Sequence, residues 1–209
     1  MAIRSVIKNV LGSSLVELMI ATLMGGMALV IVGGVFISNQ RSAAEKAKEI
    51  MLLQNLTSVM QQLKEDVQRA GFEDDVAKSV MFSDSTEVIH IGGHNTILGY
   101  VYRVASGSSS EYLHVFYKYD SQTSRLMLCE KRNITPLSVV VATTSGVKGN
   151  CYSLFDPHQI YITDFSVHRY LLENQSKSAL LTVRLSAALT RDISIRQSLE
   201  IKVKQRNWQ

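Results

Sequence analysis

The feature that most constrains this chain is a long apolar run near its N-terminus. From Leu15 to Ser38 the sequence contains no Lys, Arg, Asp, His or Pro, and its single charged residue is Glu17. About 20 apolar residues suffice for a helix to span the hydrocarbon core of a bilayer, so the run predicts a membrane helix. A charge near the centre of such a helix costs about 2.5–3.5 kcal/mol on insertion scales, and less near an end. Glu17 therefore needs a partner or a task.

A glycine lies five residues before this acid, in the segment Gly12-Ser13-Ser14-Leu15-Val16-Glu17-Leu18-Met19. The segment resembles the processing motif of type IV prepilins, in which a dedicated peptidase cuts after the glycine on the cytoplasmic side. In that family the glutamate supports methylation of the new N-terminus and docks the subunit into a growing fibre. The resemblance implies cleavage between Gly12 and Ser13, N-methylation of Ser13, and an assembly role for Glu17. Ser13 stands where the family usually has Phe.

Two simpler interpretations compete with this one. A removable secretory signal has an apolar region of about 7–15 residues, which this run exceeds, and Glu17 would sit badly within it. A plain single-pass anchor fits the length but gives no reason for the spacing between Gly12 and Glu17. The prepilin interpretation is therefore favoured.

The charge balance places few limits on the partners of the chain. The 209 residues are enough for one ordinary domain plus a membrane helix. Loss of a leader containing Arg4 and Lys8 lowers the formal charge from +4 to +2. Cations concentrate only near the C-terminus, at Arg191, Arg196, Lys202, Lys204 and Arg206. This cationic stretch makes nucleic acid a possible partner, but a less favoured one.

Cysteine usage indicates an oxidising compartment. The chain has only Cys129 and Cys151, both beyond the predicted membrane helix, and one such pair suits a bridge in the periplasm. Closing a loop of this length stabilises a fold by roughly 3 kcal/mol on the loop-entropy model. Two unpaired buried thiols are the alternative. Neither cysteine has Cys or His neighbours at the spacing of a zinc site, so no metal is expected.

The helix is predicted to continue beyond the membrane. No helix breaker follows Ser38, and Gly71 stands where a helix would be capped, so one helix is expected from about Ser14 to Ala70. Its first half is apolar on nearly all sides and must lie in lipid or among similar helices. Its second half is amphipathic and should pack on a domain. The apolar stripe of that half contains Ala47, Ile50, Leu53, Leu56, Met60, Leu63, Val67 and Ala70.

From Glu87 onward the apolar period changes from that of a helix to that of a strand. Strands are expected within residues 87–91, 97–104, 111–119, 125–129, 160–171, 179–189 and 193–203. The predicted fold is α+β and pilin-like, with one long N-terminal helix packed on a C-terminal antiparallel sheet. The predicted divisions are a leader (1–12), a transmembrane and assembly helix (13–38), an amphipathic helix (39–72) and a periplasmic β domain (73–209).

A second resemblance narrows the family. The segment from Leu63 to Phe72 is similar to the helix exit of PilW-type minor pilins and of the related pseudopilin J of type II secretion, and Arg206-Asn207 to their C-termini. It implies a minor pilin that helps initiate or assemble a type IV pilus. The implied partners are other pilins, the prepilin peptidase and the inner-membrane assembly platform. The implied location is the bacterial inner membrane, with the C-terminal domain in the periplasm, and then the pilus. A secretion pseudopilin, or a pilus-tip module that binds DNA or a surface, remains the alternative.

Candidate chemical groups are sparse. His90 and His94 flank Gly92-Gly93 in a predicted turn, where exposed histidines are more common than a metal site. The sequence lacks a Gly-x-Ser-x-Gly motif, a phosphate-binding loop and a Cys-His pairing. We therefore expect no enzyme, cofactor or metal. The tyrosines at 100, 102, 112, 117 and 119 are interpreted as packing residues, with a ligand-stacking surface as the alternative.

Overall fold

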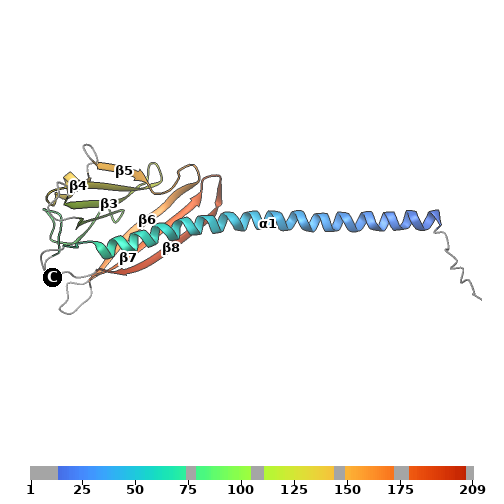
Figure 1. Cartoon of the computed structure of the whole chain (residues 1–209), viewed down its shortest axis with the longest axis horizontal. Helices are drawn as coiled ribbons and strands as arrows, with labels where there is room; N and C mark the ends of the chain where they lie inside the picture. The colour runs from blue at the N-terminus through green and yellow to red at the C-terminus, as the bar shows by residue number, and fades with distance from the viewer. Residues whose placement is uncertain (1–13, 74–78, 105–110, 144–148, 172–178, 206–209) are drawn as a thin grey trace, which may run out of the picture. The chain divides into compact units, whose positions relative to one another are not determined.

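The computed structural model describes residues 14–73, 79–104, 111–143, 149–171 and 179–205. The chain divides into two compact units, residues 1–47 and 48–209. The helix α1 (Leu15–Arg69), labelled in Figure 1, contributes residues to both units. Its second half joins an antiparallel β structure, which confirms the expected α+β, pilin-like fold.

The first unit contains the apolar half of α1. Its large apolar side chains, from Leu15 to Ile37, are 50–75% exposed. Among the described residues, α1 is the helix whose length and composition would allow it to cross a membrane. The apolar surface is thus available to lipid or to other helices, as a helix that is apolar on all sides requires.

The second unit begins at Lys48, and one face of α1 enters its core there. The buried residues of this face are Leu52, Leu56, Val59, Met60, Leu63, Val67 and Ala70. The predicted stripe is right from Leu56 onward but wrong before it, because Ile50 and Leu53 are exposed and Leu52 is buried. Four adjacent apolar residues, Ile50 to Leu53, offer several possible faces, and the hydrophobic period alone does not choose among them.

The helix ends as expected at Gly71, whose φ of 78° lies in the left-handed region. The Gly71 N–H donates to the Val101 carbonyl at 2.8 Å, so the chain turns directly onto the sheet. A side chain at this position would meet Val88, because a Cβ would lie 2.5 Å from Val88 Cγ1. Glycine is therefore required by both backbone conformation and space.

The strands form two antiparallel sheets rather than the single sheet expected. Sheet A has the order β1-β2-β3-β4-β5, and sheet B has the order β6-β7-β8. The strands of sheet A are β1 (Ile89–Gly92), β2 (Ile97–Arg103), β3 (Tyr112–Asp120), β4 (Arg125–Asn133) and β5 (Gly149–Ser153). Those of sheet B are β6 (Ile160–Leu171), β7 (Ala179–Leu189) and β8 (Asp192–Lys204). The sequence pattern did not predict β5.

The two sheets differ in how their faces are covered. One cluster of buried residues joins α1 to both sheets, with Tyr117 of sheet A and Val183 of sheet B among its members. A second cluster combines Phe116 and Val101 of sheet A with Phe82 and with Ala142 of the short helix α2 (Val139–Thr143). Sheet A therefore packs on both faces. Sheet B packs on one face, and its other face carries exposed side chains.

Candidate functional site

The first turn of α1 contains a reciprocal pair of hydrogen bonds. The Ser14 N–H donates to Glu17 Oε2 at 2.9 Å, and the Glu17 N–H donates to Ser14 Oγ at 3.3 Å. This is a capping box, in which an N-cap serine and an acid three residues later each satisfy a backbone N–H of the other. The negative carboxylate also lies at the positive end of the helix dipole. Glu17 therefore has a partner within its own chain.

This cap was missed in the sequence, although its signal is present. Ser-x-x-Glu directly before an apolar run is the pattern of a capping box, and Ser14 and Glu17 have that spacing. The other residues of the predicted processing site, Gly12 and Ser13, lie outside the described residues. Their roles, and the assembly role of Glu17, stay predictions.

Cys129 and Cys151 are joined in a disulfide. They lie directly opposite each other on β4 and β5, with their Cα atoms 4.0 Å apart. The bridge attaches β5, the strand at the edge of sheet A, to β4. This arrangement agrees with the pairing expected from the sequence and gives the cysteines a structural position.

Three of the five tyrosines, Tyr100, Tyr102 and Tyr117, lie where α1 packs on sheet A. Tyr100 and Tyr117 are fully buried, and the Tyr117 hydroxyl donates to Asp66 Oδ2 at 2.5 Å. Burial, together with the Asp66 carboxylate, raises the pKa of both tyrosines well above the usual range. The guanidinium of Arg69 lies 5.5 Å from the centroid of the Tyr102 ring. These contacts fix the end of the helix on the sheet.

The remaining two tyrosines are also held by protein groups. The hydroxyl of Tyr112 donates to Glu73 Oε2, and that of Tyr119 donates to the Ile162 carbonyl, both at 3.2 Å. Glu73 also pairs with Arg103 at 2.6 Å, and Arg103 forms a further ion pair with Glu111. Packing and hydrogen bonding thus account for the positions of the tyrosines of sheet A.

The histidines fall into structural or surface positions. His114 is fully buried, and its pKa is lowered because burial disfavours the charged ring. His90 packs edge-on against Phe82, and His94 occupies the turn between β1 and β2. In the described parts of the chain, no group of three or more His, Cys, Asp or Glu side chains could hold a metal ion.

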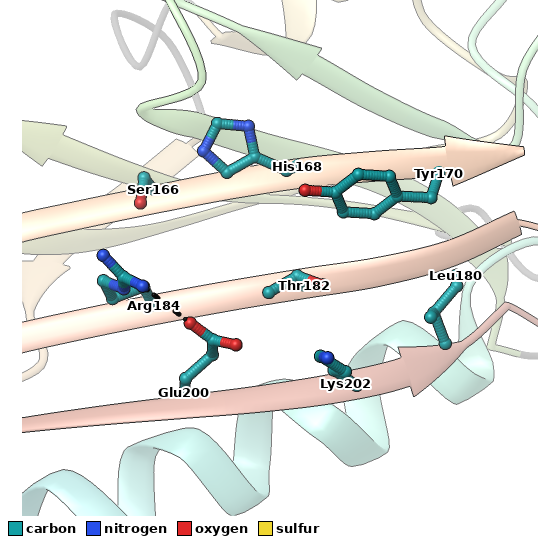
Figure 2. Close-up of a pocket in the computed structure, with 8 residues that line it drawn as sticks. All are labelled: Ser166, His168, Tyr170, Leu180, Thr182, Arg184, Glu200 and Lys202. Carbon is teal, nitrogen blue, oxygen red and sulfur yellow. Dashed lines mark hydrogen bonds and ion pairs between the residues drawn. The ribbon is translucent and has the colours of Figure 1, made fainter.

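The open face of sheet B carries a polar groove, shown in Figure 2. It has a volume of about 510 Å³ and receives side chains from all three strands. Its lining residues are Ser166, His168 and Tyr170 of β6, Leu180, Thr182 and Arg184 of β7, and Glu200 and Lys202 of β8. Arg184 and Glu200 form an ion pair at 2.9 Å across β7 and β8. Lys202 of the C-terminal cationic stretch thus shares this face with the exposed rings of β6, and β7 lies between them.

Comparison with protein families gives the decisive match. The family described as prepilin peptidase-dependent protein B (PpdB) matches residues 45–205. The chain belongs to the PpdB family. The match covers most of the second unit, whereas the prepilin-like motif precedes it, so two separate parts of the chain point to the same class. Searches of curated proteins and of solved structures find no match.

Membership of the PpdB family establishes a pilin-related context for the features above. The apolar half of α1, capped at Glu17, is the part that could anchor a PpdB-family protein in a membrane. The disulfide and the two sheets lie within the residues that the family model matches.

Proposed function

We propose that this protein is a non-enzymatic assembly subunit, a PilW-type minor pilin that helps initiate or assemble a type IV pilus. The observation that carries the proposal is the PpdB-family match combined with an apolar helix headed by Glu17. A secretion pseudopilin is the related alternative. The two differ in the partners that they would meet, namely other minor and major pilins or the components of a secretion system.

In the proposed mechanism, prepilin peptidase cuts between Gly12 and Ser13 and leaves a free amine on Ser13. Ser14 keeps its peptide N–H after the cut, so the capping box with Glu17 survives processing. Before assembly the subunit lies in the inner membrane with its β domain in the periplasm. In this state the cap reduces the cost of keeping the Glu17 carboxylate in lipid. Because the first turn of a helix lies near one end of the span, the insertion cost is below that at the centre.

Assembly would exchange this internal partner for one on a neighbouring subunit. The Glu17 carboxylate and the Ser13 amine of a neighbour, at about 4 Å, attract by roughly 4 kcal/mol at an effective dielectric of 20. That gain is comparable to the cost of holding a charge in lipid, about 2.5–3.5 kcal/mol at the centre. We therefore propose that Glu17 is held by Ser14 before assembly and pairs with the Ser13 amine of a neighbouring subunit after it.

The experiment combines intact mass with assembly of three variants. The mature protein from membranes should lack residues 1–12 and should carry one methyl group if Ser13 is modified. Glu17→Ala should stay in the membrane but should not assemble. Ser14→Ala removes the hydroxyl of the cap but keeps the Ser14 N–H, whereas Ser14→Thr is the matched control that keeps a hydroxyl.

We expect Ser14→Ala to weaken assembly less than Glu17→Ala, since N-cap replacement by Ala costs about 1 kcal/mol. Ser14→Thr should assemble normally. A full-length mass would contradict processing, and with it the mechanism, because Ser13 would have no free amine. Normal piliation of the processed Glu17→Ala variant would contradict the role of the carboxylate.

A further inference from the structure

The open face of sheet B orders its side chains in repeated rows. In the register of the three strands, Tyr170 of β6 lies beside Leu180 of β7, which lies beside Lys204 of β8. The next row has His168, Thr182 and Lys202 in the same order. Each row therefore places a ring on one outer strand, a small or apolar side chain in the middle, and a lysine on the other outer strand.

The spacing of these rows follows from sheet geometry. Successive residues on one face of an antiparallel strand are about 6.8 Å apart, and two strand spacings separate β6 from β8 by about 9.6 Å. Tyr170 is 57% exposed, and His168, Lys202 and Lys204 are exposed as well. The rings and the lysines are thus accessible to one ligand lying across the three strands.

The charge of the face is unbalanced at the lysine rows. Glu200, the acid of the groove, pairs with Arg184. These two residues form the row next to that of Thr182 and Lys202, so the charges of their row cancel. Arg196 extends the cationic side along β8. Lys202 and Lys204 therefore present positive charge on β8, two strand spacings from the aromatic side chains of β6 on the same face.

We propose that this face binds single-stranded nucleic acid, with successive phosphates beside Lys202 and Lys204 and the corresponding bases against His168 and Tyr170. A nucleotide has its phosphate at one end and a flat base at the other, as each row has its lysine and its ring. Proteins that bind single strands combine a cationic track with aromatic stacking platforms in this way. A duplex offers phosphates, but its bases are stacked on each other and cannot reach the rings.

This proposal is independent of fibre assembly, because the face belongs to a single subunit. It also differs from the nucleic-acid site considered from the sequence in the residues that would contact the bases. The cationic last strand takes part, as that alternative required, but the tyrosines of sheet A are replaced by Tyr170 and His168 of β6.

The test uses the full chain in nanodiscs of zwitterionic lipid, unassembled, with fluorescent dT12 as the probe. We expect salt-sensitive binding of dT12 that exceeds binding of a duplex of the same length. Tyr170→Ala should weaken dT12 binding by about 5- to 150-fold through loss of stacking. Tyr152→Ala is the matched control, since Tyr152 is 47% exposed on sheet A.

The lysines are tested through the salt dependence of the same binding. Lys202→Gln combined with Lys204→Gln should reduce the slope of log affinity against log salt by about 1.4, because each phosphate contact to a single strand contributes about 0.7. Lys64→Gln combined with Lys118→Gln is the matched control, since both lysines are exposed and belong to α1 and β3 rather than to sheet B. Thermal unfolding of each variant checks that the fold is intact.

Three results would overturn the proposal. The first is no dT12 binding at low salt. The second is binding that the lysine variant weakens and Tyr170→Ala leaves unchanged, while heparin competes as effectively as unlabelled DNA. That result would identify a face for polyanions in general. The third is equal affinity for duplex and single strand.

Discussion

At the scale of single residues, several buried polar groups of this protein are held by specific partners. His114 is the clearest case. The Leu137 N–H donates to His114 Nε2 at 2.8 Å, so His114 Nδ1 carries the proton and donates to the Lys131 carbonyl at 3.0 Å. A neutral ring thereby connects β3, β4 and the segment that leads to α2. Protonation would place a hydrogen on Nε2 and abolish the bond from Leu137.

This arrangement predicts a dependence of stability on pH. The pKa of His114 is lowered in the folded state, so below about pH 6.5 the unfolded chain binds a proton that the folded chain resists. The free energy of unfolding should be highest above that pH and should fall by up to about 1.4 kcal/mol per pH unit on acidification. Thermal unfolding of the full protein between pH 5 and 8 measures this.

His114→Gln keeps an acceptor and a donor but does not titrate, so its stability should change less over the same range. His158→Gln, at an exposed histidine, should retain the pH dependence of the wild type. Parallel curves for wild type and His114→Gln would show that His114 is not the responsible group.

At the scale of elements, the end of α1 decides how the helix joins sheet A. Gly71 combines a left-handed backbone with close contact to Val88. Gly71→Ala should therefore lower the free energy of unfolding by about 2 kcal/mol or more, from the left-handed conformation and from overpacking. Unfolding of the full chain by denaturant, followed by a spectroscopic signal from the second unit, would measure the change.

The contribution of Val88 can be separated from that of the backbone. In a Val88→Ala background the methyl group facing Gly71 is gone, so Gly71→Ala should cost less there than in the wild type. Equal costs in the two backgrounds would mean that the contact with Val88 contributes nothing.

Sequence periodicity predicted the long elements well and the short ones poorly. The helix was expected from Ser14 to Ala70 and extends from Leu15 to Arg69. The alternation within 160–171 and 179–189 likewise predicted the bounds of β6 and β7. In contrast β5 is short, and its placement depends on pairing with β4 through Cys129 and Cys151, which local pattern does not contain.

The division into two sheets could not be predicted for a similar reason. Strand patterns indicate which residues alternate, but the partner of each strand depends on contacts far apart in the chain. The candidate site shows both situations. The cap of Ser14 and Glu17 has a local sequence signal, although it was not predicted, whereas the rows of Tyr170 and Lys204 exist only through the register of β6, β7 and β8.

At the scale of the whole molecule, the two units have opposite surfaces. The first exposes apolar side chains along its helix, and the second has a buried apolar core formed by two clusters. The family match lies almost entirely in the second unit, so that unit carries the features that define a PpdB-family protein. The first unit carries the residues proposed for anchoring and assembly.

The disulfide between β4 and β5 has a consequence for limited proteolysis. Because Cys129 and Cys151 are covalently joined, a single cut of the backbone between them produces two fragments that remain one molecule. Protein nicked in this interval should migrate as the intact chain on a non-reducing gel and separate into two bands only after a thiol is added. Separation without reductant would contradict the bridge. The same linkage would let a nicked subunit keep β5 attached to sheet A, so that damage to the connection need not release either half of the chain.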